Sequence, residues 1–278
     1  MVKWLSALWL AGLCSTLAWA EVPPASPAPL SSAPTNPALK RLPTVWNSAG
    51  VHQGIALYTQ NIPGQDLKAF KGSMDVPAGL SQVTAALADL DSMHEWFFLL
   101  EHARFLGRPS LENTQVYLQM RGIWPVSARD VVAQVHTTQH PRTLAIHMHV
   151  VSAAHLLPEQ PGFVRIPALL SIWTLTPLPN GHTRVDLEGQ ADPGGWIPLT
   201  LANFMVTTLP RETLMKLRQH MQHPDYRDPA TLEARLGHLR HVAAQLRFPD
   251  QPQWPALLSG TQSETLPPST PGRSLRKP

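Results

Sequence analysis

The chain has 278 residues, of which 15% are charged and 43% are hydrophobic, and its formal net charge is +3. This length allows one domain with extensions or two small domains, and it is enough to bury a hydrophobic core without disulfides. The basic residues are not clustered, which argues against a nucleic-acid-binding protein. The single cysteine, Cys14, excludes an internal disulfide and a cysteine-based zinc site.

The first twenty residues have the features of a secretory signal peptide. Lys3 provides the positive start, residues 5–17 are apolar, and Ala18-Trp19-Ala20 fits the small-x-small cleavage rule. We therefore expect cleavage after Ala20 and a periplasmic or secreted protein. The alternative is an uncleaved anchor, although the apolar run is short for a membrane span.

Two proline-rich segments flank the folded part of the chain. Residues 21–43 contain seven prolines and are predicted to form a stiff linker. Residues 249–278 contain another seven and are predicted to be a disordered tail. The folded domain is therefore expected at residues 44–222, followed by a C-terminal amphipathic helix within residues 223–248.

The domain is predicted to start with a β-hairpin and two helices. Residues 52–62 and 67–76 alternate apolar and polar side chains and flank the turn signal Pro63-Gly64. Pro77 then opens a helix whose apolar residues keep helical spacing as far as Leu90. Residues 91–100 are predicted to be a second short helix or a turn.

A run of strands follows these helices. Alternation predicts strands over residues 114–120, 130–138, 143–151, 163–176 and 183–191, with a break in the fourth at Pro167. A single apolar face on each strand indicates an antiparallel sheet that is covered on one side only.

Two helices end the predicted domain and its extension. Residues 198–220 carry a broad apolar stripe, and Pro210 inside it is expected to kink or split the helix. It is the only element long enough to cover the apolar face of the sheet, which makes the protein α+β. Residues 230–246 form the further amphipathic helix, which we expect to pack outside the sheet or to mediate contacts.

Four groups of residues, in order along the chain, carry a resemblance to a known family. They are residues 54–59 with 67–72, Trp124-Pro125-Val126 with Arg129-Asp130, residues 173–178 with Gly181 and 183–185, and residues 191–195 with 197–198 and 201–203. These residues resemble bacterial START (StAR-related lipid-transfer) domains. The resemblance implies a helix-grip fold, in which a curved antiparallel sheet wraps around a long C-terminal helix. It also implies a cavity that binds one lipid or other hydrophobic molecule for transfer or sensing, with no cofactor.

The candidate ligand-binding residues follow from this expected cavity. A site for a hydrophobic ligand is mostly apolar, with a few placed polar groups. The candidates are Met120, Trp124, Val135, Met148, Phe163, Arg165, Trp173, Leu201, Phe204, Met205 and Thr208. The alternative is that these side chains simply fill a core.

The charged candidate is Arg165, and its position matters because of a departure from the family. Animal relatives that carry phosphatidylcholine or sterol have an arginine a few residues after the Arg-Asp pair, where this chain has Val135. A phosphate-binding arginine is therefore missing from that strand position. Arg165 either supplies a substitute charge inside the cavity or faces water.

A metal site is the first alternative to lipid binding. Period two places His147 and His149 on one face of a strand, and His136 is expected on the matching face of its neighbour. Three imidazoles could hold zinc, but that face is the predicted solvent face, and no carboxylate is obvious nearby to orient the rings. We therefore expect no metal.

Catalysis and docking are the remaining alternatives. The chain has no GxSxG, HExxH or kinase motif, and Asp130, Asp186, Glu188 and Asp192 are explained by solvated ion pairs with Arg129 and Arg184. We therefore predict no catalytic residue and a monomer with transient membrane contact. An enzyme on the same fold, or a cell-envelope interaction module that docks through residues 230–246, stays open.

Overall fold

The computed structural model describes residues 42–63, 67–228, 231 and 240–252. All of them belong to one compact unit of the chain, Asn36–Pro278. The predicted signal peptide, most of the predicted linker and most of the predicted tail lie outside the described residues.

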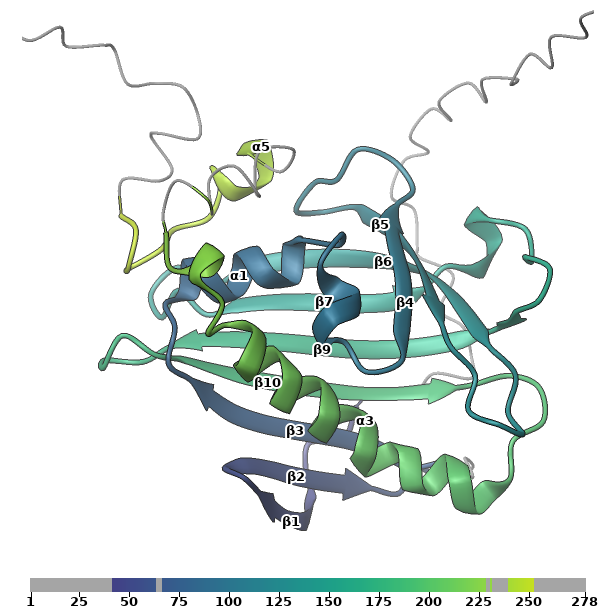
Figure 1. The fold of residues 1–278 in the computed structure, drawn as a ribbon. Helices are drawn as coiled ribbons and strands as arrows, with labels where there is room; N and C mark the ends of the chain where they lie inside the picture. Colours follow the sequence, from purple (N-terminus) through teal and green to yellow (C-terminus); the bar gives the residue numbers. More distant parts are fainter. Residues whose placement is uncertain (1–41, 64–66, 229–230, 232–239, 253–278) are drawn as a thin grey trace, which may run out of the picture. The chain divides into compact units, whose positions relative to one another are not determined.

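Ten strands of the described residues form one sheet. Their bounds are β1 (Asn47–His52), β2 (Ile55–Gln60), β3 (Ala69–Val76), β4 (Leu100–Phe105), β5 (Thr114–Met120), β6 (Arg129–Gln139), β7 (Ile146–Ser152), β8 (Val164–Arg165), β9 (Ala168–Pro177) and β10 (Thr183–Asp192). The order across the sheet is β1-β2-β3-β10-β9-β7-β6-β5-β4 (Figure 1). Every neighbouring pair in this order is antiparallel, and the short β8 pairs with β6 in parallel.

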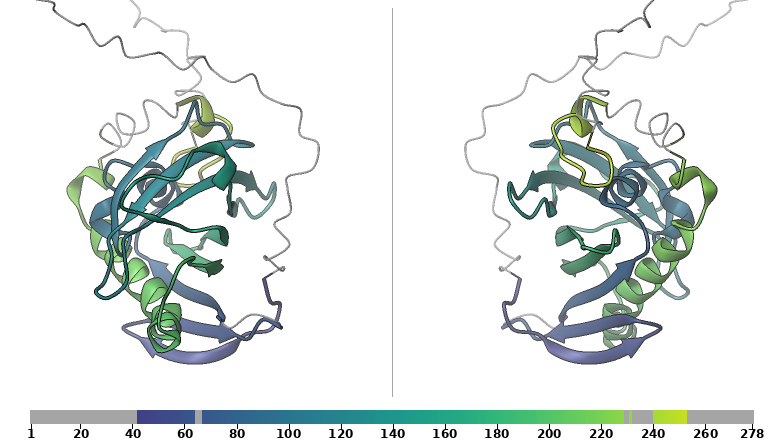
Figure 2. Two further views of the ribbon diagram at one scale, coloured as in Figure 1. Left: turned by 90° about the vertical axis from the view of Figure 1, so that its right-hand side faces the viewer. Right: turned by 90° about the vertical axis from the view of Figure 1, so that its left-hand side faces the viewer.

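Strand alternation produces one apolar and one polar face, as the sequence predicts. On β10, Val185 and Leu187 are buried, whereas the side chains of Asp186 and Glu188 form ion pairs with Lys71 on the outer face. Seen edge-on in Figure 2, the sheet curves from β4–β6 to β1–β3, with α3 (Leu199–His220) on its concave side. The α+β helix-grip architecture is confirmed.

The shorter helices lie on the same face of the sheet as α3. They are α1 (Leu80–Ala88) and α2 (Met93–Trp96) (Figure 1). The 3₁₀ turn η2 (Pro224–Tyr226) and the short α5 (Arg240–Ala243) contribute Tyr226 and Ala243 to the same core as α1. The 3₁₀ turn η1 (Ala154–Leu156) follows β7. Within the described part of the chain, no helix combines the length and the apolarity that a membrane crossing needs.

Helix α3 approaches β3 closely because β3 has a glycine at the contact. A Cβ on Gly72 would lie 2.6 Å from Leu214 Cδ1 and 3.2 Å from Pro210 Cβ. A single helix runs through Pro210, so of the two predicted outcomes, a kink or a split, the split does not occur. Pro210 is itself buried against β3 and helps to seat the helix.

Two strands were not predicted. Residues 47–52 form β1, which reaches β2 through the two-residue turn Gln53-Gly54, where both residues have positive φ. This is the geometry of a type I′ hairpin turn, for which a glycine at the second position is favourable. Strand β4 follows α2 at the other edge of the sheet; the predicted helix or turn ends at residue 100, and the sequence predicts no element for residues 101–105.

The C-terminal segment packs differently from the expectation. Ala243, Leu246 and Phe248 are buried in the main hydrophobic core with α1, α3 and the sheet. Asp250, in the predicted tail, accepts hydrogen bonds from the backbone N–H and the hydroxyl of Ser81 at the start of α1. The described residues 240–252 are therefore part of the folded unit rather than an outer docking surface. Most of the predicted helix at residues 230–246 lies outside the described residues.

Candidate functional site

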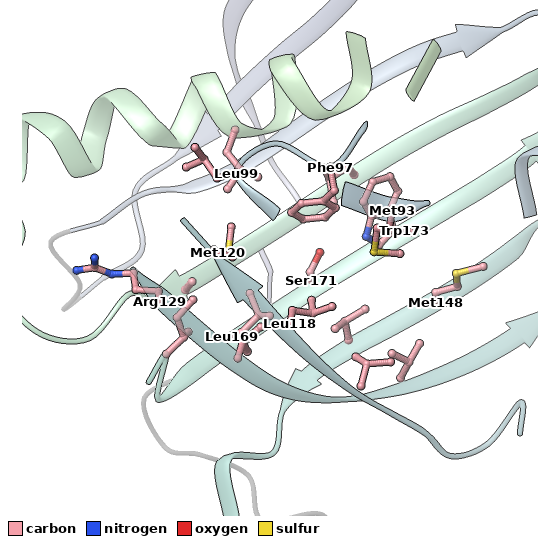
Figure 3. Close-up of a pocket in the computed structure, with 18 of the residues that line it drawn as sticks. Met93, Phe97, Leu99, Leu118, Met120, Arg129, Met148, Leu169, Ser171 and Trp173 are labelled. Carbon is pink, nitrogen blue, oxygen red and sulfur yellow. The ribbon is translucent and has the colours of Figure 1, made fainter. Parts of the chain in front are cut away.

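A pocket of about 380 Å³ lies on the concave side of the sheet, and its lining is almost entirely apolar (Figure 3). This volume falls in the range of about 300–1,000 Å³ that is typical of sites for one small ligand. The pocket is lined by members of both buried hydrophobic clusters of the domain and by exposed residues such as Lys68 and Arg121, so it extends from the core to the surface.

The sheet wall of the pocket follows strand alternation. Every second residue of a strand faces the same side, and the inward residues of four strands line the pocket: Val116, Leu118 and Met120 of β5, Val131 and Val135 of β6, Met148 and Val150 of β7, and Leu169, Ser171 and Trp173 of β9. The hydroxyl of Ser171 donates a hydrogen bond to the backbone carbonyl of Glu188 and is satisfied within the sheet.

Helices and the C-terminal segment close the pocket on the other side. Trp96 and Phe97, at the end of α2, pack against Trp173 with ring centroids 6.1 and 6.4 Å away, respectively. Met93 and Met148 lie beside this aromatic cluster (Figure 3), and methionine side chains adapt easily to ligand shape. Residues of α3 and of the C-terminal segment complete the wall: Leu201, Ala202, Met205, Val206 and Leu209, with Val242 and Leu246.

The charged residues of the pocket lining are all cationic. Lys68, Arg121 and Arg129 contribute to the lining, and no Asp, Glu, His or Cys does among the described residues. Lys68 and Arg121 are exposed, whereas Arg129 is only 8% exposed. Figure 3 shows Arg129 at one end of the pocket, with Trp173 and Met148 toward the other.

The guanidinium of Arg129 is held by three backbone carbonyls. Its Nε donates to Pro193 at 3.2 Å, one terminal nitrogen donates to Ser127 at 2.6 Å, and the other donates to Gly194 at 3.3 Å. These acceptors are neutral, and no described carboxylate forms an ion pair with it. Burial lowers the pKa of Arg129 from its ordinary value, because desolvation disfavours the charged form.

Six of the eleven predicted ligand-binding residues line the pocket. They are Met120, Val135, Met148, Trp173, Leu201 and Met205. The other five do not. Trp124 is 92% exposed in the loop between β5 and β6, Phe204 faces outward from α3, and Phe163 lies in the loop before β8. Thr208 is buried on α3 outside the pocket lining.

Arg165 neither enters the pocket nor faces water. Its guanidinium binds both carboxylate oxygens of Asp130 at 2.8 and 2.9 Å and donates to the carbonyls of Ala154, Leu157 and Pro158. Asp130 is fully buried and also accepts a hydrogen bond from the Tyr117 hydroxyl. The hydrogen bond to Asp130 raises the pKa of Arg165.

This ion pair corrects the expected partner of Asp130. The sequence suggested a solvated pair with Arg129, which is adjacent along the strand. Adjacent strand residues face opposite sides of a sheet, so Arg129 reaches the pocket while Asp130 lies on the outer face and meets Arg165 from β8. Arg184 also has a different partner from the one expected, because its guanidinium binds the carboxylate of Asp75.

The three histidines of the metal hypothesis lie on the outer face of β6 and β7. His136 pairs with His149 across the strands, and the ring of His147 contacts the hydroxyl of Thr174 at 3.1 Å. Burial and the neighbouring imidazoles lower the pKa of His149. No group of His, Cys, Asp or Glu within the described ranges is arranged to hold a metal ion.

Sequence reasoning missed Arg129 as a pocket residue. Its signal was present: Arg129 has the same strand parity as Val131 and Val135, which predicts the same face. The α2 residues and the C-terminal residues Val242 and Leu246 gave no such signal, because their facing depends on tertiary packing.

Comparison with known proteins identifies the family of the chain. A family model for the START domain matches residues 45–226, so the chain belongs to the START family. An uncharacterized protein of Pseudomonas aeruginosa is 30% identical over 173 residues, which cover 62% of this chain and 85% of the relative.

Solved structures agree with this assignment. The crystal structure of a STAR-related lipid transfer protein fragment from Xanthomonas axonopodis is 31% identical, with a TM-score of 0.60, and covers 64% of this chain and 99% of that chain. Human StAR-related lipid transfer protein 5 shares the fold at 16% identity and a TM-score of 0.58, covering 64% of this chain and 86% of the human one.

Proposed function

We propose that this protein binds a lipid or another hydrophobic small molecule in its pocket and carries or senses it outside the cytoplasm. The observation that carries the proposal is the almost entirely apolar pocket of about 380 Å³ inside a START domain. An apolar molecule is stabilised when its surface leaves water, by roughly 25 cal/mol for each Å² that is buried. The resemblance to signal peptides at residues 1–20 supports export to the periplasm or the medium.

Binding without covalent chemistry fits the pocket best. The described lining has no carboxylate, imidazole or thiol that could act as an acid, base or nucleophile. Four of its hydroxyl groups, those of Thr84, Ser110, Thr114 and Ser171, donate to backbone carbonyls. We therefore propose a carrier or sensor rather than an enzyme, and one that needs no cofactor.

Transient membrane contact is proposed at the end of the pocket where Arg129 lies. The hydrogen bonds of Arg129 join the loop at residues 121–128 to the loop that follows β10. Trp124 in the first loop is 92% exposed and Trp196 in the second is 71% exposed. Exposed tryptophans suit the boundary between water and lipid, since their rings are apolar and their N–H groups are polar. We propose that a monomer docks there to load or release its ligand.

The test is native mass spectrometry of the full-length gene product purified from the cell envelope of its own organism, followed by lipid extraction. We expect a stoichiometric bound lipid and a protein mass that begins at Glu21. Met148→Trp fills the pocket and should lose the bound molecule, whereas Val51→Trp, on the exposed strand β1, adds the same ring elsewhere and should keep it.

Two results would contradict the proposal separately. Equal ligand retention by both variants would show that the molecule binds outside the pocket. A mature mass that retains residues 1–20 would refute cleavage and leave ligand binding to be judged on the extracted lipid. Transfer and sensing are then separated by vesicles: a carrier moves labelled lipid between two vesicle populations, and a sensor does not.

A further inference from the structure

We infer that the pocket selects an amphiphile with a single apolar chain and an anionic oxygen head group, which Arg129 binds. This inference rests on the proposed function and names the ligand class for the same pocket. It comes from the charge distribution of the lining, which has cations and no described acid.

The first step is the unused capacity of Arg129. A guanidinium has five N–H donors, and three of them go to the carbonyls of Ser127, Pro193 and Gly194. One N–H group on each terminal nitrogen is left. Each can donate to an oxygen of a carboxylate or phosphate, and charge-assisted bonds of this kind are stronger than bonds between neutral groups.

The second step is the uncompensated charge. The side chain is nine-tenths buried, and its pKa is lowered by burial alone, with no attractive contribution from an acid. The only adjacent carboxylate in the sequence, Asp130, is on the opposite face of the sheet and is occupied by Arg165. A buried cation without an opposite charge is costly, so an anionic ligand would offset a penalty that the empty pocket carries.

The third step is position and size. Arg129 lies at one end of the pocket, and the apolar wall extends from it past Met120 and Leu169 toward Trp173 (Figure 3). A head group at Arg129 would therefore leave its chain along this wall. The volume of about 380 Å³ is near the lower end of the range for ligand pockets, which favours one chain over the two chains of a diacyl phospholipid.

The exposed cations near this end would act at longer range. Lys68 and Arg121 also border the pocket and are exposed. Charges of one sign around an opening attract the opposite ion and accelerate its arrival, with a strong dependence on ionic strength. Added salt should therefore lower the association rate constant of an anionic amphiphile. It should change the dissociation rate constant less, because the contact with Arg129 is buried.

The experiment compares three hexadecyl amphiphiles on the full-length chain. Hexadecanoate, hexadecyl phosphate and hexadecanol are each titrated against bound Nile red, a neutral dye, below the concentration at which the amphiphile aggregates. The displacement of the dye gives the affinity of each compound. We expect at least one of the two anions to bind about 10- to 100-fold more tightly than the alcohol, from the strength of hydrogen bonds to charged groups. Which anion is preferred identifies the head group as a carboxylate or a phosphate.

Variants connect the preference to Arg129. Arg129→Gln should remove most of the preference for the anions over hexadecanol. Arg129→Lys should keep part of the preference. Arg142→Gln, which removes one positive charge from an exposed turn, should keep all of it.

The inference fails if hexadecanol binds as tightly as both anions in the unaltered protein. It also fails if folded Arg129→Gln, checked by circular dichroism, keeps the preference or loses all three ligands equally. Should that variant not fold, the unaltered protein and Arg129→Lys decide the matter. If neither Nile red nor any hexadecyl compound binds, the proposed function itself is refuted.

Discussion

The contact between β3 and α3 predicts a measurable energetic coupling between Gly72 and Leu214. Leu214 is fully buried, and a Cβ on Gly72 would overlap its Cδ1 at 2.6 Å. Gly72→Ala therefore overpacks the contact and should cost about 1–3 kcal/mol. Leu214→Ala removes three buried carbon atoms and should cost about 2–5 kcal/mol.

In the double variant, the new methyl group takes part of the space that Leu214 leaves. We expect the double variant to lose less stability than the two single variants lose together, by at least about 1 kcal/mol. Urea unfolding followed by tryptophan fluorescence measures all four proteins. Gly107→Ala is the matched control, because its Cβ would meet nothing within 4 Å, and its effect should add to that of Leu214→Ala. Additivity of the Gly72 pair within about 0.5 kcal/mol would refute the reasoning.

Three further predictions concern charges outside the pocket. Asp130→Asn leaves the buried Arg165 without its carboxylate and should cost about 3–5 kcal/mol in urea unfolding. Asp75→Asn breaks an exposed pair of the same chemistry and should cost less than about 1 kcal/mol; equal costs would contradict the role of burial. The pKa of His149 is lowered in the fold, so the unfolded chain binds its proton first, and stability should fall as the pH falls below 6.5. His149→Gln should flatten this part of the stability-pH curve, and an unchanged slope would exclude His149 as its source.

The sheet side of the pocket could be predicted because strands have a simple period. Met120, Val135, Met148 and Trp173 were selected from alternation and from the family resemblance, and all four line the pocket. The same alternation predicts that His136, His147 and His149 lie on the outer face of the sheet, as the structure shows. Strand β4 escaped prediction because residues 100–105 place two adjacent polar side chains, Glu101 and His102, between its apolar ones, which hides the period.

The helix and loop contributions could not be predicted to the same degree. A helix turns by about 100° per residue, so Leu201 and Met205 face the pocket while Phe204, inside the same apolar stripe, faces outward. Trp124 lies in a loop that has no period at all. The partner of Arg165 is decided by the pairing of β8 with β6, which brings together residues 35 positions apart.

The C-terminal segment contributes one wall of this pocket from outside the residues that the START model matches. The START model matches residues only as far as 226, yet Val242 and Leu246 lie against the pocket, and Phe248 is buried in the core. Family membership therefore predicts the sheet and α3 sides of the site but leaves this wall to residues outside the matched domain.

Leu246 and Phe248 separate the two roles of this segment. Both side chains are buried, at 3% and 2% exposed, but only Leu246 lines the pocket. Leu246→Ala and Phe248→Ala should each destabilise the fold, by about 2–5 and 3–5 kcal/mol respectively. Only Leu246→Ala should enlarge the pocket. Its affinity for bulkier competitors, measured by displacement of Nile red, should therefore rise. If Phe248→Ala shifts ligand preference equally while still folded, the segment acts through general stability, and the pocket wall is set by the START domain alone.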